Sequence, residues 1–161
     1  PDRSPRSDAV YSRRKARILA LCMLYSMELR KDDAPGDARL VLDFFTRRFD
    51  QSIVDYAFHL MRTVTANCRA MDERIRAHAH HWHLSRLAMV DKVLMRIALA
   101  EMLYEPRLAP VICINEAIDI SKIYSTGESG HFINGVLDAI HKEATAAAKT
   151  PSPSTAPAAP A

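Results

Sequence analysis

Four basic side chains stand within five positions near the start of the sequence and lead directly into an apolar stretch. They are Arg13, Arg14, Lys15 and Arg17. Tyr25 follows Arg14 by eleven positions, about three helical turns, so the two lie on nearly the same face of a helix. Cationic side chains bind phosphates, and an aromatic ring can stack a base. The pattern predicts nucleic-acid binding; the alternative is a solvated helix start with Tyr25 in the core.

The charge of the 161-residue chain supports this prediction because it is unevenly distributed. The formal net charge is +3. Residues 1–17 carry six basic and two acidic side chains, a net +4, whereas residues 18–143 carry 15 basic and 17 acidic ones, a net −2. Residues 144–161 carry one lysine. A cationic segment on a slightly acidic body is typical of local contact with an anion such as nucleic acid.

Four histidines around Trp82 form a second polar group, with i, i+3 spacings that a metal ion could use. They are His78, His80, His81 and His83. No cysteine or carboxylate stands at a matching offset among them, so we predict no metal site and no cofactor. The three cysteines are too widely spaced for a zinc ribbon or a disulfide framework, and we expect buried thiols in a reducing cytoplasm.

The sequence contains no motif of a known catalytic site, such as a phosphate-binding glycine loop or a nucleophile elbow. Glu116 and Asp119 are helical carboxylates near basic residues, a pattern more typical of ion pairs than of acid–base catalysis. No apolar run approaches the roughly 18 residues that span a bilayer, and no signal peptide is evident. We therefore predict a cytoplasmic protein that is not an enzyme and has no contact with a membrane.

Long stretches without proline or glycine, with apolar residues every three or four positions, predict an all-α fold of six or seven helices. The expected ranges are 12–29, about 38–49, 51–71 with a continuation or restart over 72–81, 86–104, one from Pro110, and 131–140. Ser52 and Ser85 are expected N-caps. Glu101 falls on an apolar stripe and must find a donor or reach solvent. Gly135, inside the last helix, would let another helix approach closely.

Three regions of different composition follow from these ranges. Residues 1–11 are expected to form a flexible basic N-terminal arm, and residues 12–143 the all-α domain. Residues 144–161 are rich in alanine and proline and are expected to be a disordered tail, because they cannot bury enough apolar surface to fold.

Three segments of the chain resemble the transcription antitermination factor NusB family. The first is SRRKAR at 12–17, followed by Ala20 and Leu24-Tyr25. The second is LSRL at 84–87 through VDK at 90–92, then LMRIA at 94–98 and EML at 101–103. The third is INEAI at 114–118, then Ser121-Lys122, and FINGVL at 132–137, which is the most diagnostic. The similarity spans about 12–142.

The resemblance implies an all-α, NusB-like fold of two packed three-helix lobes and a non-enzymatic, RNA-binding function. It implies binding of single-stranded boxA RNA from ribosomal RNA leaders, together with the small ribosomal subunit protein NusE, in a complex that helps RNA polymerase resist termination. It also implies either a monomer or a homodimer. The family positions that meet RNA correspond to Arg13, Arg14, Lys15, Arg17, Tyr25, Glu128, His131 and Phe132. Taken alone, Phe132 on its apolar stripe favours the core, and only the resemblance brings stacking on RNA level with that interpretation.

Asp91 corresponds to an acidic family position at the surface for the protein partner. Two other functions stay open: an accessory NusB-like domain that acts with a ribosomal RNA methyltransferase, and a helical protein-interaction subunit that binds no RNA. Replacing Arg13, Arg14 and Arg17 by alanine is expected to abolish RNA binding and to leave the helical spectrum unchanged.

Overall fold

The computed structural model describes residues 5–30, 43, 47–80 and 87–149, with side chains from residue 12 to residue 148 within those ranges. This part of the chain contains helices and turns and no strand, in agreement with the predicted all-α class. The helices are α1 (Pro5–Leu29), α3 (Gln51–His78), α4 (Met89–Tyr104), α5 (Pro110–Tyr124) and α6 (Ser129–Lys149). None of these helices is long and apolar enough to cross a membrane.

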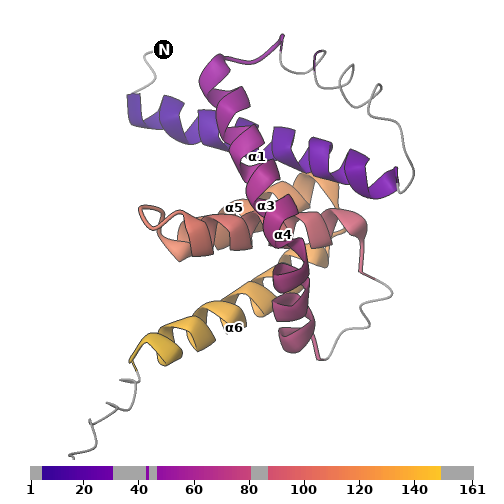
Figure 1. Ribbon diagram of the computed structural model, residues 1–161, viewed down its shortest axis with the longest axis vertical. Helices are drawn as coiled ribbons and strands as arrows, with labels where there is room; N and C mark the ends of the chain where they lie inside the picture. Colours follow the sequence, from indigo (N-terminus) through magenta and orange to yellow (C-terminus); the bar gives the residue numbers. More distant parts are fainter. Residues whose placement is uncertain (1–4, 31–42, 44–46, 81–86, 150–161) are drawn as a thin grey trace, which may run out of the picture.

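Helix α4 is the centre of the fold. It packs against α1, α3, α5 and α6, and every residue from 93 to 101 is buried. A helix that is apolar around its whole circumference must be covered by neighbours on all sides. Figure 1 shows α1 crossing one end of the molecule and the C-terminal half of α6 leaving at the other, with α4 between them.

The described residues contain five helices, fewer than the six or seven expected, and these helices fall into two groups. Helices α4, α5 and α6 all contact one another and make the C-terminal group. Helices α1 and α3 pack together in the N-terminal group, and α4 joins the two groups. The expected helix over 38–49 falls mostly on residues outside the described ranges.

The helices at both chain ends extend beyond the expected all-α domain of residues 12–143. Helix α1 begins at Pro5, so residues 5–11 of the expected N-terminal arm are helical. Proline suits the first turn of a helix, and neither glycine nor proline interrupts the chain from there to Leu29. Helix α6 continues to Lys149, past the expected start of the tail at residue 144, because alanine, the strongest helix former, dominates that stretch.

The internal boundaries mostly agree with the predictions. Pro110 opens α5, as expected. Helix α3 runs unbroken to His78, so the segment after residue 71 continues that helix and does not restart. Asp50, not Ser52, precedes α3, and Ala88 precedes α4; neither makes a side-chain capping hydrogen bond. The expected cap Ser85 lies outside the described residues.

A partly buried ion pair joins the two groups of helices. Arg96 on α4 is 3% exposed and donates two hydrogen bonds of 2.7 Å to the carboxylate of Asp72 on α3. It also donates to Glu28 on α1. Burial acts to raise the pKa of Asp72, but the hydrogen bonds and charge of Arg96 outweigh it, so that the pKa lies below its ordinary value.

Acid should therefore weaken the fold through Asp72. Its lowered folded-state pKa stabilises the protein above the unfolded pKa of about 4, and this contribution is lost as pH falls through the folded value. We expect the urea midpoint to fall as the pH drops below about 4. Asp72→Asn should show a shallower fall over that range. Parallel pH curves for the two proteins would contradict the assignment.

Gly135 does not serve the close helix approach that its position in α6 suggests. It is exposed, and a Cβ atom built there would meet nothing within 4 Å. The expectation of a tight contact is wrong because Gly135 faces away from α3, α4 and α5, whereas its neighbours Ile133 and Val136 point into the core.

Gly135→Ala should consequently stabilise the protein. Alanine lowers the conformational entropy of the unfolded chain and meets no obstacle in the helix, so we expect the free energy of unfolding to rise by about 1 kcal/mol. Chemical denaturation measures the change. Gly130→Ala is the matched comparison: its Cβ would lie 3.4 Å from the side chain of Ile118 in the first turn of α6, so its gain should be smaller. A loss of stability in Gly135→Ala would contradict this account.

Candidate nucleic-acid interface

Helix α1 turns its four clustered basic residues toward different surroundings. Successive residues of a helix point about 100° apart, so neighbouring side chains cannot share one face. Arg13 is exposed, Lys15 is half-buried, and Arg17 is only 3% exposed. Arg14 lies between these extremes, with 35% of its side chain exposed. The cluster seen in the sequence is therefore divided between surface and interior.

Arg17 belongs to a buried ion pair with Glu101 of α4. Its Nε lies 3.0 and 2.9 Å from the two carboxylate oxygens of Glu101, and a terminal nitrogen donates to Glu116 of α5 at 3.1 Å. Burial acts to lower the pKa of Arg17, but the hydrogen bonds and charge of Glu101 outweigh it and keep the pKa above its ordinary value. Glu101 has found the donor that its apolar stripe requires.

This placement argues against the expected role of Arg17 in RNA contact, which stays a prediction. A guanidinium that is already bonded to two carboxylates under the surface cannot reach a phosphate. The triple alanine variant expected to keep its helical spectrum would instead remove this buried pair and damage the fold, so it is not a clean test of RNA binding.

Arg14 is held by the acidic face of α5. It donates to Glu116 at 2.9 and 2.6 Å and to Asp119 at 3.0 Å. The hydrogen bonds and charge of Glu116, then those of Asp119, outweigh partial burial and raise the pKa of Arg14 above its ordinary value. Glu116 and Asp119 act as ion-pair partners, as their spacing predicts. Arg14 retains some exposure, but a phosphate must compete with two carboxylates for it.

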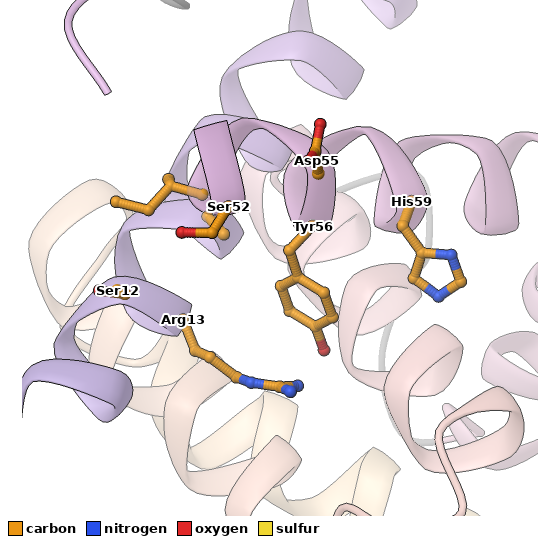
Figure 2. Close-up of a pocket in the computed structure, with 8 residues that line it drawn as sticks. Ser12, Arg13, Ser52, Asp55, Tyr56 and His59 are labelled. Carbon is orange, nitrogen blue, oxygen red and sulfur yellow. The ribbon is translucent and has the colours of Figure 1, made fainter. Parts of the chain in front are cut away.

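Arg13 is the cation of the cluster that is most open to solvent. Its guanidinium carbon lies 4.5 Å from the centre of the Tyr56 ring, over the ring face. Tyr56 comes from α3, and its hydroxyl donates to Glu101 at 2.6 Å. The two residues line an open hollow of about 480 Å³ between α1 and the start of α3, and Figure 2 shows their side chains pointing toward each other.

The remaining expected site residues occupy two different kinds of place. Tyr25 on α1 is half-buried. Glu128 and His131 are exposed before and in the first turn of α6, where RNA could reach them. Phe132 is 5% exposed and packs in the hydrophobic core. The interpretation of Phe132 as a core residue therefore fits the structure, and the covered ring argues against the predicted stacking of Phe132 on RNA.

Asp91 is also largely covered, with 5% exposure. It stands in the first turn of α4, where the helix dipole favours a negative charge. One carboxylate oxygen accepts a hydrogen bond of 2.7 Å from the Ser129 hydroxyl, which also contacts the side chains of Ser125 and Thr126. Asp91 thus holds the α5–α6 connection, and any contact with a partner protein would act through that connection.

Only two of the four clustered histidines, His78 and His80, lie among the described residues. Within the described ranges, no group of three or more His, Cys, Asp or Glu side chains could hold a metal ion. The Nε2 atom of His78 lies 3.0 Å from Glu143 of α6, and its Nδ1 atom lies 2.9 Å from a backbone carbonyl. His81 and His83 lie outside the described residues.

Sequence reasoning did not single out Tyr56, which is half-buried against the core and lines the hollow. Tyr56 sits on an apolar stripe with Ile53 and Leu60, which indicates core. The available signal was Glu101: a buried carboxylate needs more than one donor, and a tyrosine hydroxyl on a neighbouring helix is a suitable partner. The helices and their order define a small all-α domain built around one buried helix, with an exposed cation over a half-buried aromatic ring on one side.

Comparison with known sequences identifies the family. The sequence pattern of the NusB family matches residues 14–142. Transcription antitermination protein NusB of Chloroherpeton thalassium is 42% identical over 134 residues, which cover 83% of this chain and 63% of that protein. The protein of the same name from Desulfosudis oleivorans is 43% identical over 134 residues, covering 82% of this chain and 86% of its own length. The chain belongs to the NusB family.

Solved structures agree with this family assignment. A structure of T. maritima NusB has a TM-score of 0.71 and 33% identity, with 81% of this chain and 91% of that chain covered. A crystal structure of antitermination factors NusB and NusE in complex with dsRNA has a TM-score of 0.71 and 27% identity, with 83% of this chain and 98% of that chain covered.

The buried pair predicts unequal effects of two arginine substitutions. Arg17→Met leaves the carboxylate of Glu101, which is 1% exposed, without its cation, and should lower the free energy of unfolding by about 3 kcal/mol. Arg14→Met, at a side chain 35% exposed, should cost less than about 1 kcal/mol. Urea denaturation measures both. Equal losses of unfolding free energy in the two variants would show that the difference in burial does not determine how much each ion pair contributes to stability.

Proposed function

We propose that this chain is a non-catalytic transcription antitermination factor that binds boxA RNA of ribosomal RNA leaders together with the protein NusE. The observation that carries the proposal is an exposed cation over an aromatic ring on the α1–α3 surface of a NusB-family domain. Cations beside aromatic rings suit single-stranded RNA, since unpaired bases expose their faces and edges while an A-form duplex hides them.

Charge and chemistry elsewhere on the chain support the same proposal. Arg13, Lys15 and part of Arg14 supply positive charge on one helix, with Tyr25 further along it. The acidic balance of residues 18–143 suits a basic ribosomal protein as partner. All three cysteines are free thiols, as in proteins of a reducing cytoplasm. The related NusB–NusE structure contains dsRNA, so single- and double-stranded RNA must be compared directly.

A gel-shift experiment tests the proposal. The purified chain, with and without NusE, is titrated against single-stranded boxA RNA, the same RNA as a duplex, and a scrambled strand. We expect the strongest shift with single-stranded boxA and NusE together, and a steep loss of affinity as salt rises. Binding of NusE without any RNA shift would favour the protein-interaction alternative, and co-purification with a methyltransferase in place of NusE would favour the accessory-domain alternative.

Arg13→Ala should weaken this RNA binding without loss of structure. The residue is exposed and forms none of the buried ion pairs, so the circular dichroism spectrum should not change. We expect the affinity for boxA RNA to fall by more than about tenfold, because the variant loses both the planar guanidinium and its charge. The control is Arg69→Ala on α3, whose side chain is 94% exposed; it removes the same charge about three and a half turns from the hollow. Equal weakening by the two variants would show that charge alone, not position, determines binding.

A further inference from the structure

The hollow between α1 and the start of α3 has the composition of a binding site for a single planar, polar group. Its polar lining consists of Ser12 and Arg13 from α1, and Ser52, Asp55, Tyr56 and His59 from α3. Figure 2 shows Arg13 and Tyr56 extending into the same space. The volume of about 480 Å³ lies within the range of small-molecule sites, roughly 300–1,000 Å³.

The Tyr56 side chain is held in place by a hydrogen bond at its buried end. Its hydroxyl donates to Glu101, which also accepts hydrogen bonds from Arg17. Burial, and then the hydrogen bond to Glu101, raise the pKa of Tyr56 above its ordinary value, so the hydroxyl stays protonated and keeps donating. The ring also stacks near His59, with centroids 6.1 Å apart and planes 26° apart. The aromatic ring is thus fixed before any ligand arrives, which lowers the entropy lost on binding.

Arg13 adds a flat cation on top of this fixed ring. A guanidinium 4.5 Å from the ring centroid is attracted to the ring face, and this orients a side chain that is otherwise free to rotate. Because Arg13 is exposed, its outer side is open to solvent. RNA-binding proteins stack unpaired bases on arginine planes as well as on aromatic rings.

We propose that this hollow, called here the Arg13–Tyr56 hollow, binds one unpaired base of the RNA, which stacks on the guanidinium that Tyr56 supports. The inference rests on the proposed function and adds a base-binding position at α3 that the family resemblance does not assign. It does not involve Tyr25.

The rim of the hollow selects the type of base. Asp55 is exposed, and one of its carboxylate oxygens is bonded to the Gln51 amide at 2.7 Å. A carboxylate accepts from the exocyclic amino group of cytosine, as in nucleic-acid recognition generally. The hydroxyls of Ser12 and Ser52 can donate or accept. A base that carries an amino group is therefore preferred over uracil, which has none.

Abasic scanning of a short single-stranded boxA-type RNA, in the presence of NusE, tests the inference. With the wild-type chain, removal of one base should reduce affinity about tenfold, as expected for the loss of one stacked base. Arg13→Lys keeps the charge and removes the plane, so it should weaken the intact RNA about tenfold and show no further loss at that abasic position. Tyr56→Phe keeps the ring and should retain the sensitivity.

Three results would overturn the inference while leaving the proposed function intact. One is wild-type affinity in Arg13→Lys, which would mean that Arg13 contacts phosphate only. Another is an unchanged abasic profile in that variant. The third is weaker binding of NusE by Arg13→Lys in the absence of RNA, which would assign the hollow to the protein partner. Failure of the wild-type chain to bind any boxA RNA would instead overturn the proposed function.

Asp55→Asn tests the base preference separately. An amide presents both donor and acceptor, so discrimination between cytosine and uracil at the sensitive position should fall about fivefold relative to the wild type. If Asp55→Asn discriminates between cytosine and uracil as well as the wild type does, Asp55 does not contact the base.

Discussion

The carboxylate of Glu101 is the point on which the rest of the structure depends. It lies within the most buried helix of the fold, where an ionised group is tolerated only if donors surround it. Arg17 comes from α1 and Tyr56 from α3, so one side chain of α4 fixes the positions of α1 and α3. Glu116 of α5 shares Arg17 and extends the same network into the C-terminal group. Packing and surface chemistry are thereby linked through a single buried charge.

The network also explains how similar residues on one helix come to have different roles. Arg17 forms an ion pair in the interior, and Arg14 pairs with α5 while part of its side chain contacts solvent. Arg13 lies on the surface. The same Glu101 that neutralises Arg17 anchors the ring beneath Arg13. A surface built in this way is rigid because its support lies in the core and not in the loops around it.

Much of the fold could be predicted from the sequence, because helical periodicity and breakers are local signals. The unbroken apolar stripes and Pro110 predicted where the helices lie. The position of Glu101 on an apolar stripe predicted that a hydrogen-bond donor must reach its carboxylate. The burial of Arg17 could not be predicted, since its partner stands 84 positions away and charge patterns do not reveal tertiary neighbours. Tyr56 was missed because its apolar stripe indicates core, whereas the residue is half-buried and its hydroxyl bonds to Glu101, 45 positions away. Phe132 shows the reverse: its apolar stripe indicates core, where the structure has it, whereas its place in the family motif implied contact with RNA.

The central position of α4 has a consequence for how the molecule can move. Because α4 contacts α1, α3, α5 and α6, neither group of helices can separate without exposing its apolar surface. Regions that lack such a shared element open by local unfolding, at a cost well below that of the whole domain. In this domain the backbone amide protons that exchange most slowly with solvent should lie in α4. Opening of either group of helices should then require nearly global unfolding. The domain therefore offers its partners a single, undivided body rather than two hinged halves.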